Sequence, residues 1–309
     1  MASVGFHCRH STAQRPFFET LDEAYNLVEH YCDNPPAMQI FLSNPRQWSI
    51  LFNDAEIAQL AAVREKHGAK LIAHSAYIDV PWRKQVAAAF GGGNGGGNGG
   101  GGIYAHIRAQ LSQCAVLGAD FVMHAQNACY TDTAARQKLL NIVQTIRRED
   151  ETSVFHPTVF FETESAKNGF ARNVQRVNSL FAESANSAAF GLCIDTAHLW
   201  ACGVDISTRE GMSAYLDALR DDMPIMFHLN DSTEPIGTGR DVHCAIGTGA
   251  IWSGFADSPL DAGFQEILDF ADDYGCVVIL ERTGKEITLA NGESINEIDR
   301  DLQLVCRRQ

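Results

Sequence analysis

Short apolar runs alternate along the chain with longer segments in which apolar residues recur every three or four positions. The short runs have the length and composition of buried strands. We expect eight strands, at residues 3–7, 38–43, 70–77, 121–125, 158–163, 190–196, 225–229 and 277–281. Amphipathic helices are predicted between them, for example at residues 22–31, 54–68 and 133–150.

Eight strands that alternate with helices predict an α/β protein with a (β/α)8 TIM barrel. A two-domain, doubly wound protein is the alternative. No linker and no shift in composition divides the 309 residues. We therefore expect residues 1–309 to form a single domain.

One segment of low complexity, GGGNGGGNGGGG at residues 91–102, interrupts this pattern. A glycine and asparagine run cannot bury a core, so we expect a flexible loop insertion. It follows the third predicted strand and precedes a helix that is expected to begin near Ile103. A neutral expansion of a surface loop explains it; a mobile flap over the catalytic face is the alternative.

Composition and charge indicate the cellular location of the protein, the state of its cysteines and its possible partners. The sequence has no apolar run long enough to span a membrane and no apolar signal core at its N-terminus, so we expect an intracellular protein, cytoplasmic or nuclear, that is not secreted. Nine cysteines without a C-x-x-C pair predict reduced thiols, with Cys193 and Cys276 in the core. The net charge of −14 is unusual for a nucleic-acid-binding protein, although bound divalent cations would change the local sign.

Residues that can bind metals gather at the ends of six successive predicted strands and in the loops that follow them. They are His74, His124, Glu162, Asp195, His198, His228, Asp241, His243 and Glu281. In a barrel the C-terminal strand ends converge on one face, where uncompensated carboxylates would be costly to bury. Imidazole and carboxylate ligands together suit zinc, with manganese or iron as alternatives.

Taken singly, each of these residues has an ordinary structural explanation. A histidine at a strand end is more often a hydrogen-bonded structural residue, and Asp195 has the position of a helix N-cap. Glu162 and Glu281 could pair with arginines such as Arg282. The joint pattern over six strands favours a metal site that holds up to three ions with a bridging carboxylate.

Several segments resemble signature segments of endonuclease IV, the family of apurinic/apyrimidinic (AP) endonucleases. They are CIDTAHLWACGVD at 193–205, HLNDS at 228–232 with GRDVH at 239–243 and IGTG at 246–249, NPRQW at 44–48 and HSAY at 74–77. The resemblance covers nearly the whole chain except the glycine run. It implies a (β/α)8 barrel with three zinc ions.

The resemblance assigns the ligand-type residues to three ions. His74, His124 and Glu162 correspond to the ligands of the first zinc, and Glu162 also bridges to the second. The second zinc's other ligands correspond to Asp195, His228 and Glu281, and the third zinc's to His198, Asp241 and His243. Mn²⁺ is an alternative at one site, and Glu162 is the expected catalytic residue.

The same resemblance implies contacts with DNA. Arg46 and Gln47 correspond to residues that enter the duplex beside the lesion, and Tyr77 to a tyrosine that fills space near the flipped nucleotide. Arg240 lies close to the position of a family arginine, which Val242 replaces. The chain also departs from the family in its phosphate-binding loops, for example at HCRHST, residues 7–12.

The implied activity is hydrolysis of the phosphodiester 5′ to an abasic site in duplex DNA, with trimming of blocked 3′ ends (3′-phosphodiesterase activity), in base excision repair. We expect a monomer that binds duplex DNA and no membrane. A metal-dependent sugar isomerase or epimerase with the same barrel is the alternative, and a barrel that binds DNA without catalysis is a third. An isomerase does not need the third set of ligands, which distinguishes the first two.

Overall fold

The computed structural model describes most of the chain. The described residues are 1–10, 15–80, 101–125, 132–149, 155–167, 169–182, 189–253, 262–288 and 294–306. Residues 91–100 of the predicted insertion lie outside them, so its flexibility stays a prediction. The helix expected from Ile103 begins two residues earlier and takes in Gly101 and Gly102, which we had placed in the insertion.

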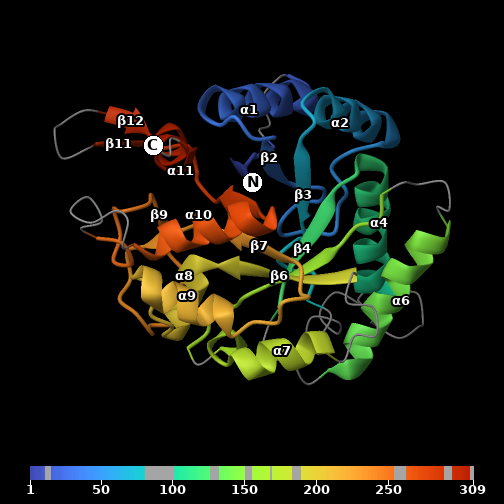
Figure 1. The fold of residues 1–309 in the computed structure, drawn as a ribbon. Coiled ribbons are helices and arrows are strands. Elements are labelled where there is room, and N and C mark those ends of the chain that lie inside the picture. Colours follow the sequence, from blue (N-terminus) through green and yellow to red (C-terminus); the bar gives the residue numbers. More distant parts are fainter. Residues whose placement is uncertain are drawn as a thin grey trace.

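Eight parallel strands form a closed barrel at the centre of the molecule (Figure 1). They are β1 Ser3–His7, β2 Ala37–Phe41, β3 Lys70–His74, β4 Asp120–His124, β5 Val159–Glu162, β6 Phe190–Asp195, β7 Ile225–His228 and β10 Val277–Leu280. Each pairs with its neighbour in chain order, and β1 closes the barrel against β10. The predicted (β/α)8 fold is confirmed, although most strands end earlier than expected.

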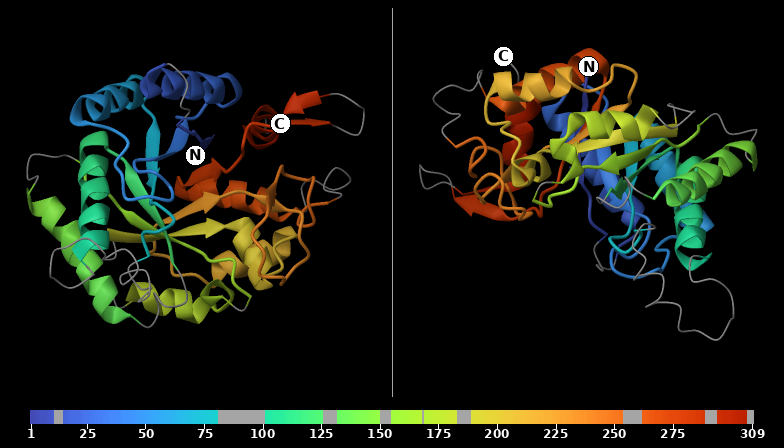
Figure 2. Two further views of the ribbon diagram at one scale, coloured as in Figure 1. Left: turned by 180° about the vertical axis from the view of Figure 1, so that it is seen from behind. Right: turned by 90° about the horizontal axis from the view of Figure 1, so that it is seen from below.

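Helices surround the barrel (Figures 1 and 2). They are α1 Phe17–Tyr31, α2 Asp54–Lys66, α4 Gly101–Leu117, α6 Thr133–Glu149, α7 Val174–Ala182, α8 Thr196–Cys202, α9 Arg209–Asp217, α10 Gly263–Tyr274 and α11 Glu297–Cys306, with a short 3-10 helix at Phe170–Arg172. Two small hairpins, β8 Asp231–Ser232 with β9 His243–Cys244 and β11 Glu286–Thr288 with β12 Ser294–Asn296, lie outside the barrel. Within the described residues, every helix is too short or too polar to cross a bilayer.

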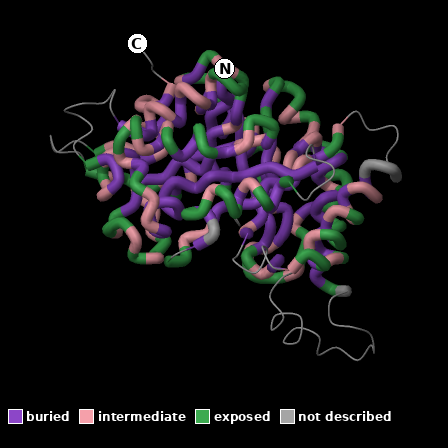
Figure 3. The backbone as a smooth tube through the Cα atoms, turned by 60° about the horizontal axis from the view of Figure 1, so that its bottom comes forward, coloured by how far each residue is buried: buried purple, intermediate pink, exposed green. Residues whose placement is uncertain are grey.

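The barrel interior is filled by side chains, and its strands form the buried centre of the molecule (Figure 3). One interior cluster takes one side chain from each of seven strands, namely Ala37, Ile72, Val122, Phe160, Cys193, Met226 and Ile279. The eighth strand, β1, has Gly5 beside Ala37. A Cβ on Gly5 would collide with the Ala37 carbonyl oxygen, so glycine allows β1 and β2 to approach each other.

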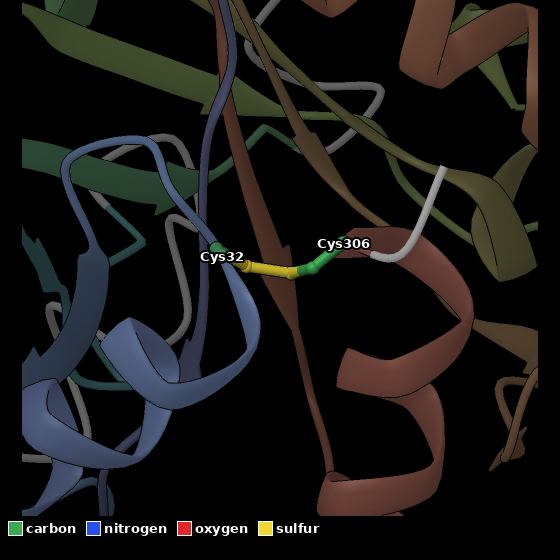
Figure 4. Close-up of a disulfide and its surroundings, with 2 residues drawn as sticks. All are labelled: Cys32 and Cys306. Atoms are coloured by element: carbon green, nitrogen blue, oxygen red, sulfur yellow. A yellow bond between two sulfur atoms is a disulfide. The ribbon is translucent and has the colours of Figure 1, made fainter. Parts of the chain in front are cut away.

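A disulfide joins the first and the last helix of the barrel (Figure 4). Cys32 is the C-cap of α1, and Cys306 is the last residue of α11. The expectation that all cysteines are reduced is therefore wrong for this pair. It rested on short sequence spacings, whereas these two residues are 274 positions apart and meet because the barrel closes. Cys193 and Cys276 are buried and free, as expected.

Candidate metal centre

A layer of polar side chains lies at the C-terminal ends of the barrel strands. Side chains on a strand alternate between its two faces, so the residue two positions after each interior apolar residue returns to the same face. In this structure that residue is polar on every strand: His7, Gln39, His74, His124, Glu162, Asp195, His228 and Glu281. The period of the strand thus converts an apolar layer into a polar layer at the face where barrel enzymes have their active sites.

Donor atoms of this layer, together with those of His198 in α8 and His243 in β9, form three groups that could each hold a metal ion. The groups are His74, His124 and Glu162; Glu162, Asp195, His228 and Glu281; and Asp195, His198 and His243. Within each group the donor atoms lie within 4.8 Å of one another. Glu162 belongs to the first two groups and Asp195 to the last two, so two buried carboxylates link the three.

Glu162 is at the centre of the layer. Its side chain is 1% exposed, and its two oxygens face four imidazoles. Oε2 lies 3.3 Å from His74 Nε2 and 3.4 Å from His124 Nδ1, and Oε1 lies 3.1 Å from His228 Nδ1 and 3.5 Å from His198 Nδ1. One carboxylate therefore contacts histidines from β3, β4, β7 and α8.

Asp195 and His198 are held together by the start of a helix. Asp195 ends β6 and is the N-cap of α8, because its Oδ1 accepts a hydrogen bond of 2.9 Å from the His198 backbone N–H. The first turn of α8 then carries His198 back over the barrel. The other oxygen, Oδ2, accepts from Asn230 Nδ2 at 2.7 Å. Asp195 is therefore a helix N-cap, as its position in the sequence suggested. The same hydrogen bond also orients Asp195 and His198 in the candidate metal site.

Asp241 and His243 reach the site from the loop after β7. Asp241 Oδ2 lies 3.2 Å from His198 Nε2, and its Oδ1 lies 2.8 Å from His243 Nε2. His243 Nδ1 lies 3.6 Å from Glu281 Oε2. The structure thus brings together all nine ligand-type residues singled out in the sequence. The third group consists of Asp195, His198 and His243. Asp241 lies beside this group and contacts both His198 and His243.

Sequence reasoning missed Gln39 and His7 in this layer. The fully buried Gln39 side chain lies 2.8 Å from His228 Nε2, 2.9 Å from Glu281 Oε1 and 3.0 Å from His7 Nδ1. Glutamine is not a metal ligand of the expected type, and the predicted ligands come only from the third to the eighth strand and the loops that follow them. The signal available was the strand period, which places both residues on the inward face.

Charges in the layer shift the pKa values of its acids. Burial raises the pKa of Glu162, but the imidazoles of His124 and His228 outweigh it and hold that pKa well below its usual range. Burial likewise opposes ionisation of Glu281, and His228 is the main group that lowers its pKa, to about 2. Burial raises the pKa of Asp195.

Five histidines of the site have shifted pKa values and divide into two sets. Burial lowers the pKa of His124 to about 4 and that of His7 to about 3, so both are neutral at pH 7. Burial also favours the neutral forms of the other three, but their surroundings outweigh it. Asp195 is the main group that raises the pKa of His198 and of His243, and Cys193, followed by Glu281 and Glu162, raises that of His228. Protons on these three imidazoles balance the buried carboxylates.

The layer fits metal ions better than it fits a set of ordinary structural polar groups. His124 Nε2 is buried and has no hydrogen-bond partner in the described part of the chain. The nine ligand-type residues bring four carboxylates and five imidazoles together, and a cation would relieve the repulsion between neighbouring acids. Oxygen and nitrogen donors without a thiolate, in groups of three or four, match the ligands of zinc.

A cavity of about 770 Å³ opens over the layer, and two of the expected DNA-binding residues line it. Arg46 is exposed at its edge, and Tyr77 is 51% exposed with its ring 5.8 Å from that of His74. The Tyr77 backbone N–H donates to the Pro45 carbonyl at 2.8 Å and ties the two loops together. Gln47 is exposed on the same loop as Arg46.

Arg240 is placed differently. Its side chain is 69% exposed and forms an ion pair of 3.2 Å with Glu234, and it is not among the residues that line the cavity. Arg9, His10 and Lys285 line the cavity instead. The cavity edge thus carries basic groups from the loops after β1, β2 and β10.

Fold and site together define a (β/α)8 barrel with three linked groups of candidate metal ligands at its C-terminal face. A model of the "Xylose isomerase-like TIM barrel" family matches residues 36–270, and the chain belongs to that family. The chain is 26% identical over 253 residues to a probable AP endonuclease of African swine fever virus, isolate Pig/Kenya/KEN-50/1950, covering 79% of this chain and 78% of that protein. It is 28% identical over 253 residues to a probable endonuclease 4 of Methanoculleus marisnigri, covering 77% and 79%. The resemblance to endonuclease IV is thus confirmed.

Solved structures agree in fold. The crystal structure of AsfvAP:AG superposes with a TM-score of 0.76 at 22% identity and covers 98% of this chain and 96% of that one. Endonuclease IV from Thermus thermophilus gives a TM-score of 0.64 at 22% identity, with 94% of both chains covered. A D-tagatose 3-epimerase-like protein gives 0.55 at 14% identity, with 90% of both covered. These structural similarities support the barrel fold. They do not distinguish an endonuclease from an epimerase, so that distinction depends on the residues of the site.

Proposed function

We propose that this chain is a zinc-dependent AP endonuclease, which hydrolyses the phosphodiester 5′ to an abasic site in duplex DNA and acts in base excision repair. The observation that carries the proposal is the set of three donor groups linked by Glu162 and Asp195. The names of the curated relatives support the same reaction. Bound zinc supplies Lewis acidity and lowers the pKa of a coordinated water toward about 7.

The residues of the chain have separable roles in this proposal. His74, His124, Glu162, Asp195, His198, His228, Asp241, His243 and Glu281 hold the metal ions. Glu162 is the catalytic residue, since it is the carboxylate that faces both of the first two groups. Arg46, Gln47 and Tyr77 contact the DNA at the mouth of the cavity, with Arg240 further out.

The cavity explains a preference for abasic sites in this proposal. The donor groups lie at the bottom of a recess, where a nucleotide paired within a duplex cannot reach them. The target nucleotide must therefore leave the helix, and an abasic nucleotide costs less to unstack than a paired base. Arg46 and Tyr77 lie where they could occupy the space that it vacates.

A sugar isomerase or epimerase is the second candidate, because proteins of that kind share the barrel. The third donor group argues against it. Asp195, His198 and His243, with Asp241 beside them, form a further metal position that an isomerase does not need.

The decisive experiment uses a duplex with one tetrahydrofuran abasic analogue, which blocks β-elimination by lyases. We expect a single cut 5′ to the analogue that leaves a 3′-hydroxyl, and no cut in the undamaged duplex. A chelator should abolish the cut, and added zinc should restore it. Absence of cleavage by zinc-loaded protein, together with turnover of a sugar, would overturn the proposal in favour of the isomerase.

The finer parts of the proposal need their own measurements. Elemental analysis of gently purified protein should find about three zinc ions per chain, one for each donor group. One ion or none would contradict this number, and manganese at one position would appear in the same analysis. Removal of a blocking group that is joined to the 3′ end through a phosphodiester, such as 3′-phosphoglycolate, tests the trimming activity, and light scattering tests the expected monomer.

A further inference from the structure

The amide of Gln39 has one orientation that its neighbours allow. A carboxylate oxygen such as Glu281 Oε1 accepts hydrogen bonds. The Gln39 Nε2 amide group lies 2.9 Å from that oxygen and must be the donor there. Its carbonyl oxygen then accepts from His228 Nε2 at 2.8 Å. The Nδ1 atom of His228 faces Glu162, Asp195 and Glu281.

This orientation also sets the tautomer of His7. The second hydrogen of the Gln39 amide group points to His7 Nδ1, 3.0 Å away, so that nitrogen accepts a hydrogen bond. The proton of the neutral imidazole is therefore on Nε2. His7 Nε2 is buried, and it has no hydrogen-bond partner among the described residues. A buried donor without a partner is costly, and His7 lines the cavity over the donor groups.

We infer that His7 is a further substrate-binding residue, whose Nε2–H donates a hydrogen bond to an oxygen of the scissile phosphodiester, with Gln39 as its positioning residue. The inference rests on the proposed function for the identity of the phosphate. A phosphate is the ligand that suits this place, because Arg9 and Arg46 line the same cavity and an anion is attracted to cations. A neutral donor at the bottom of the cavity adds a directed contact to these charges.

His7 does not act as a tenth metal ligand in this arrangement. A nitrogen that binds a metal needs a free lone pair, and Nδ1 uses its lone pair to accept from Gln39 while Nε2 carries the proton. Freeing Nε2 would require the Gln39 amide to turn over. Its oxygen would then face the Glu281 carboxylate oxygen at about the present distance of 2.9 Å, which places two acceptors together.

Two substitutions of similar size distinguish a role of the His7 Nε2 donor in phosphate binding from a role in the stability of the fold. His7→Asn keeps an acceptor near Nδ1 and removes the Nε2 donor, whereas His7→Gln can return an N–H group to that position. The probe is inorganic phosphate, titrated calorimetrically into zinc-loaded protein at fixed salt. We expect His7→Asn to keep the zinc content of the wild type and to bind phosphate about tenfold to hundredfold more weakly, as for one hydrogen bond to an anion. His7→Gln should recover most of that loss.

Other outcomes overturn the inference. Unchanged phosphate affinity in His7→Asn would mean that the donor serves the fold, and loss of zinc in step with phosphate would mean that His7 is a metal ligand. Nitrogen-15 spectra of the metal-free wild type give a second test, in which His7 must show the Nε2–H tautomer. Gln39→Met should abolish this preference; the same tautomer in that variant would show that Gln39 does not position His7.

A third titration distinguishes this inference from the proposed function. Binding of the uncut abasic duplex, with the metal-free protein as reference, should weaken in His7→Asn by the same factor as phosphate binding. If the wild type binds phosphate through His7 and does not cut the abasic duplex, the proposed function fails and the phosphate site stands. If it cuts the duplex and His7→Asn binds phosphate normally, only the inference about His7 fails.

Discussion

Replacing Glu162 by glutamine tests the part of the site on which most contacts depend. The substitution keeps the volume of the side chain and removes its charge and one acceptor oxygen. Four imidazoles lie within 3.5 Å of the carboxylate, and Glu162 belongs to two of the three donor groups. A change at this one position therefore weakens two metal positions together.

The size of the effect follows from that count. Loss even of an outer partner of a metal ligand commonly costs 10- to 100-fold in metal affinity or activity, and loss of a direct ligand costs at least as much. Two positions that weaken together give a loss of roughly 10²- to 10⁴-fold in the rate of cleavage. Asp241→Asn should have a smaller effect, because Asp241 contacts only the histidines of the third group and its side chain is 45% exposed.

The assay combines the rate of cleavage of the tetrahydrofuran duplex with the zinc content of each variant. Glu266→Gln is the control, since this carboxylate pairs with Arg209 on the outside of the barrel. We expect the control to match the wild type and Glu162→Gln to lose zinc and activity while circular dichroism shows a folded barrel. A folded Glu162→Gln protein with wild-type zinc content and more than about a tenth of the activity would refute the bridging role.

Three further predictions concern other parts of the molecule. Zinc binding to metal-free protein at pH 7 should release about two to three protons, because the pKa values of His198, His228 and His243 are raised. Zinc affinity should therefore rise with pH. Calorimetry in buffers of different ionisation enthalpy measures the release, and zero net release would contradict the prediction. Arg46→Ala with Gln47→Ala should leave zinc content unchanged and weaken binding to abasic duplex far more than to single-stranded abasic DNA; equal losses would indicate plain phosphate contact. Cys32→Ser should lower the free energy of unfolding by about 2–4 kcal/mol in denaturant titrations, whereas Cys244→Ser, at a free cysteine, should change it little.

The barrel and most of the site could be predicted because both follow from local sequence patterns. Alternating strands and helices specify the fold, and the fold alone brings strand ends together, so His74 and Glu281 could be expected near each other although 207 positions separate them. The roles of individual ligands came from the resemblance to endonuclease IV. Residue type alone could not show that Asp195 would belong to two groups.

Three features could not be predicted in this way, and each has a physical reason. Gln39 acts through hydrogen bonds to His228 and Glu281, which depend on side-chain positions across the barrel. Arg240 forms an ion pair with Glu234, which depends on the conformation of the loop after β7, and its contact with DNA stays a prediction. The disulfide depends on how the last helix packs against the first.

The disulfide between Cys32 and Cys306 closes the chain between these two residues into a covalent ring. A protease that cuts once anywhere inside this ring produces two polypeptide segments that remain one molecule. A cut between Cys32 and β10 leaves the neighbouring strands β1 and β10 on different segments, so their pairing also holds the two segments together. A nicked protein would run as a single species on a non-reducing gel and separate only after reduction, so cleavage of a loop and dissociation of the barrel are distinct chemical events.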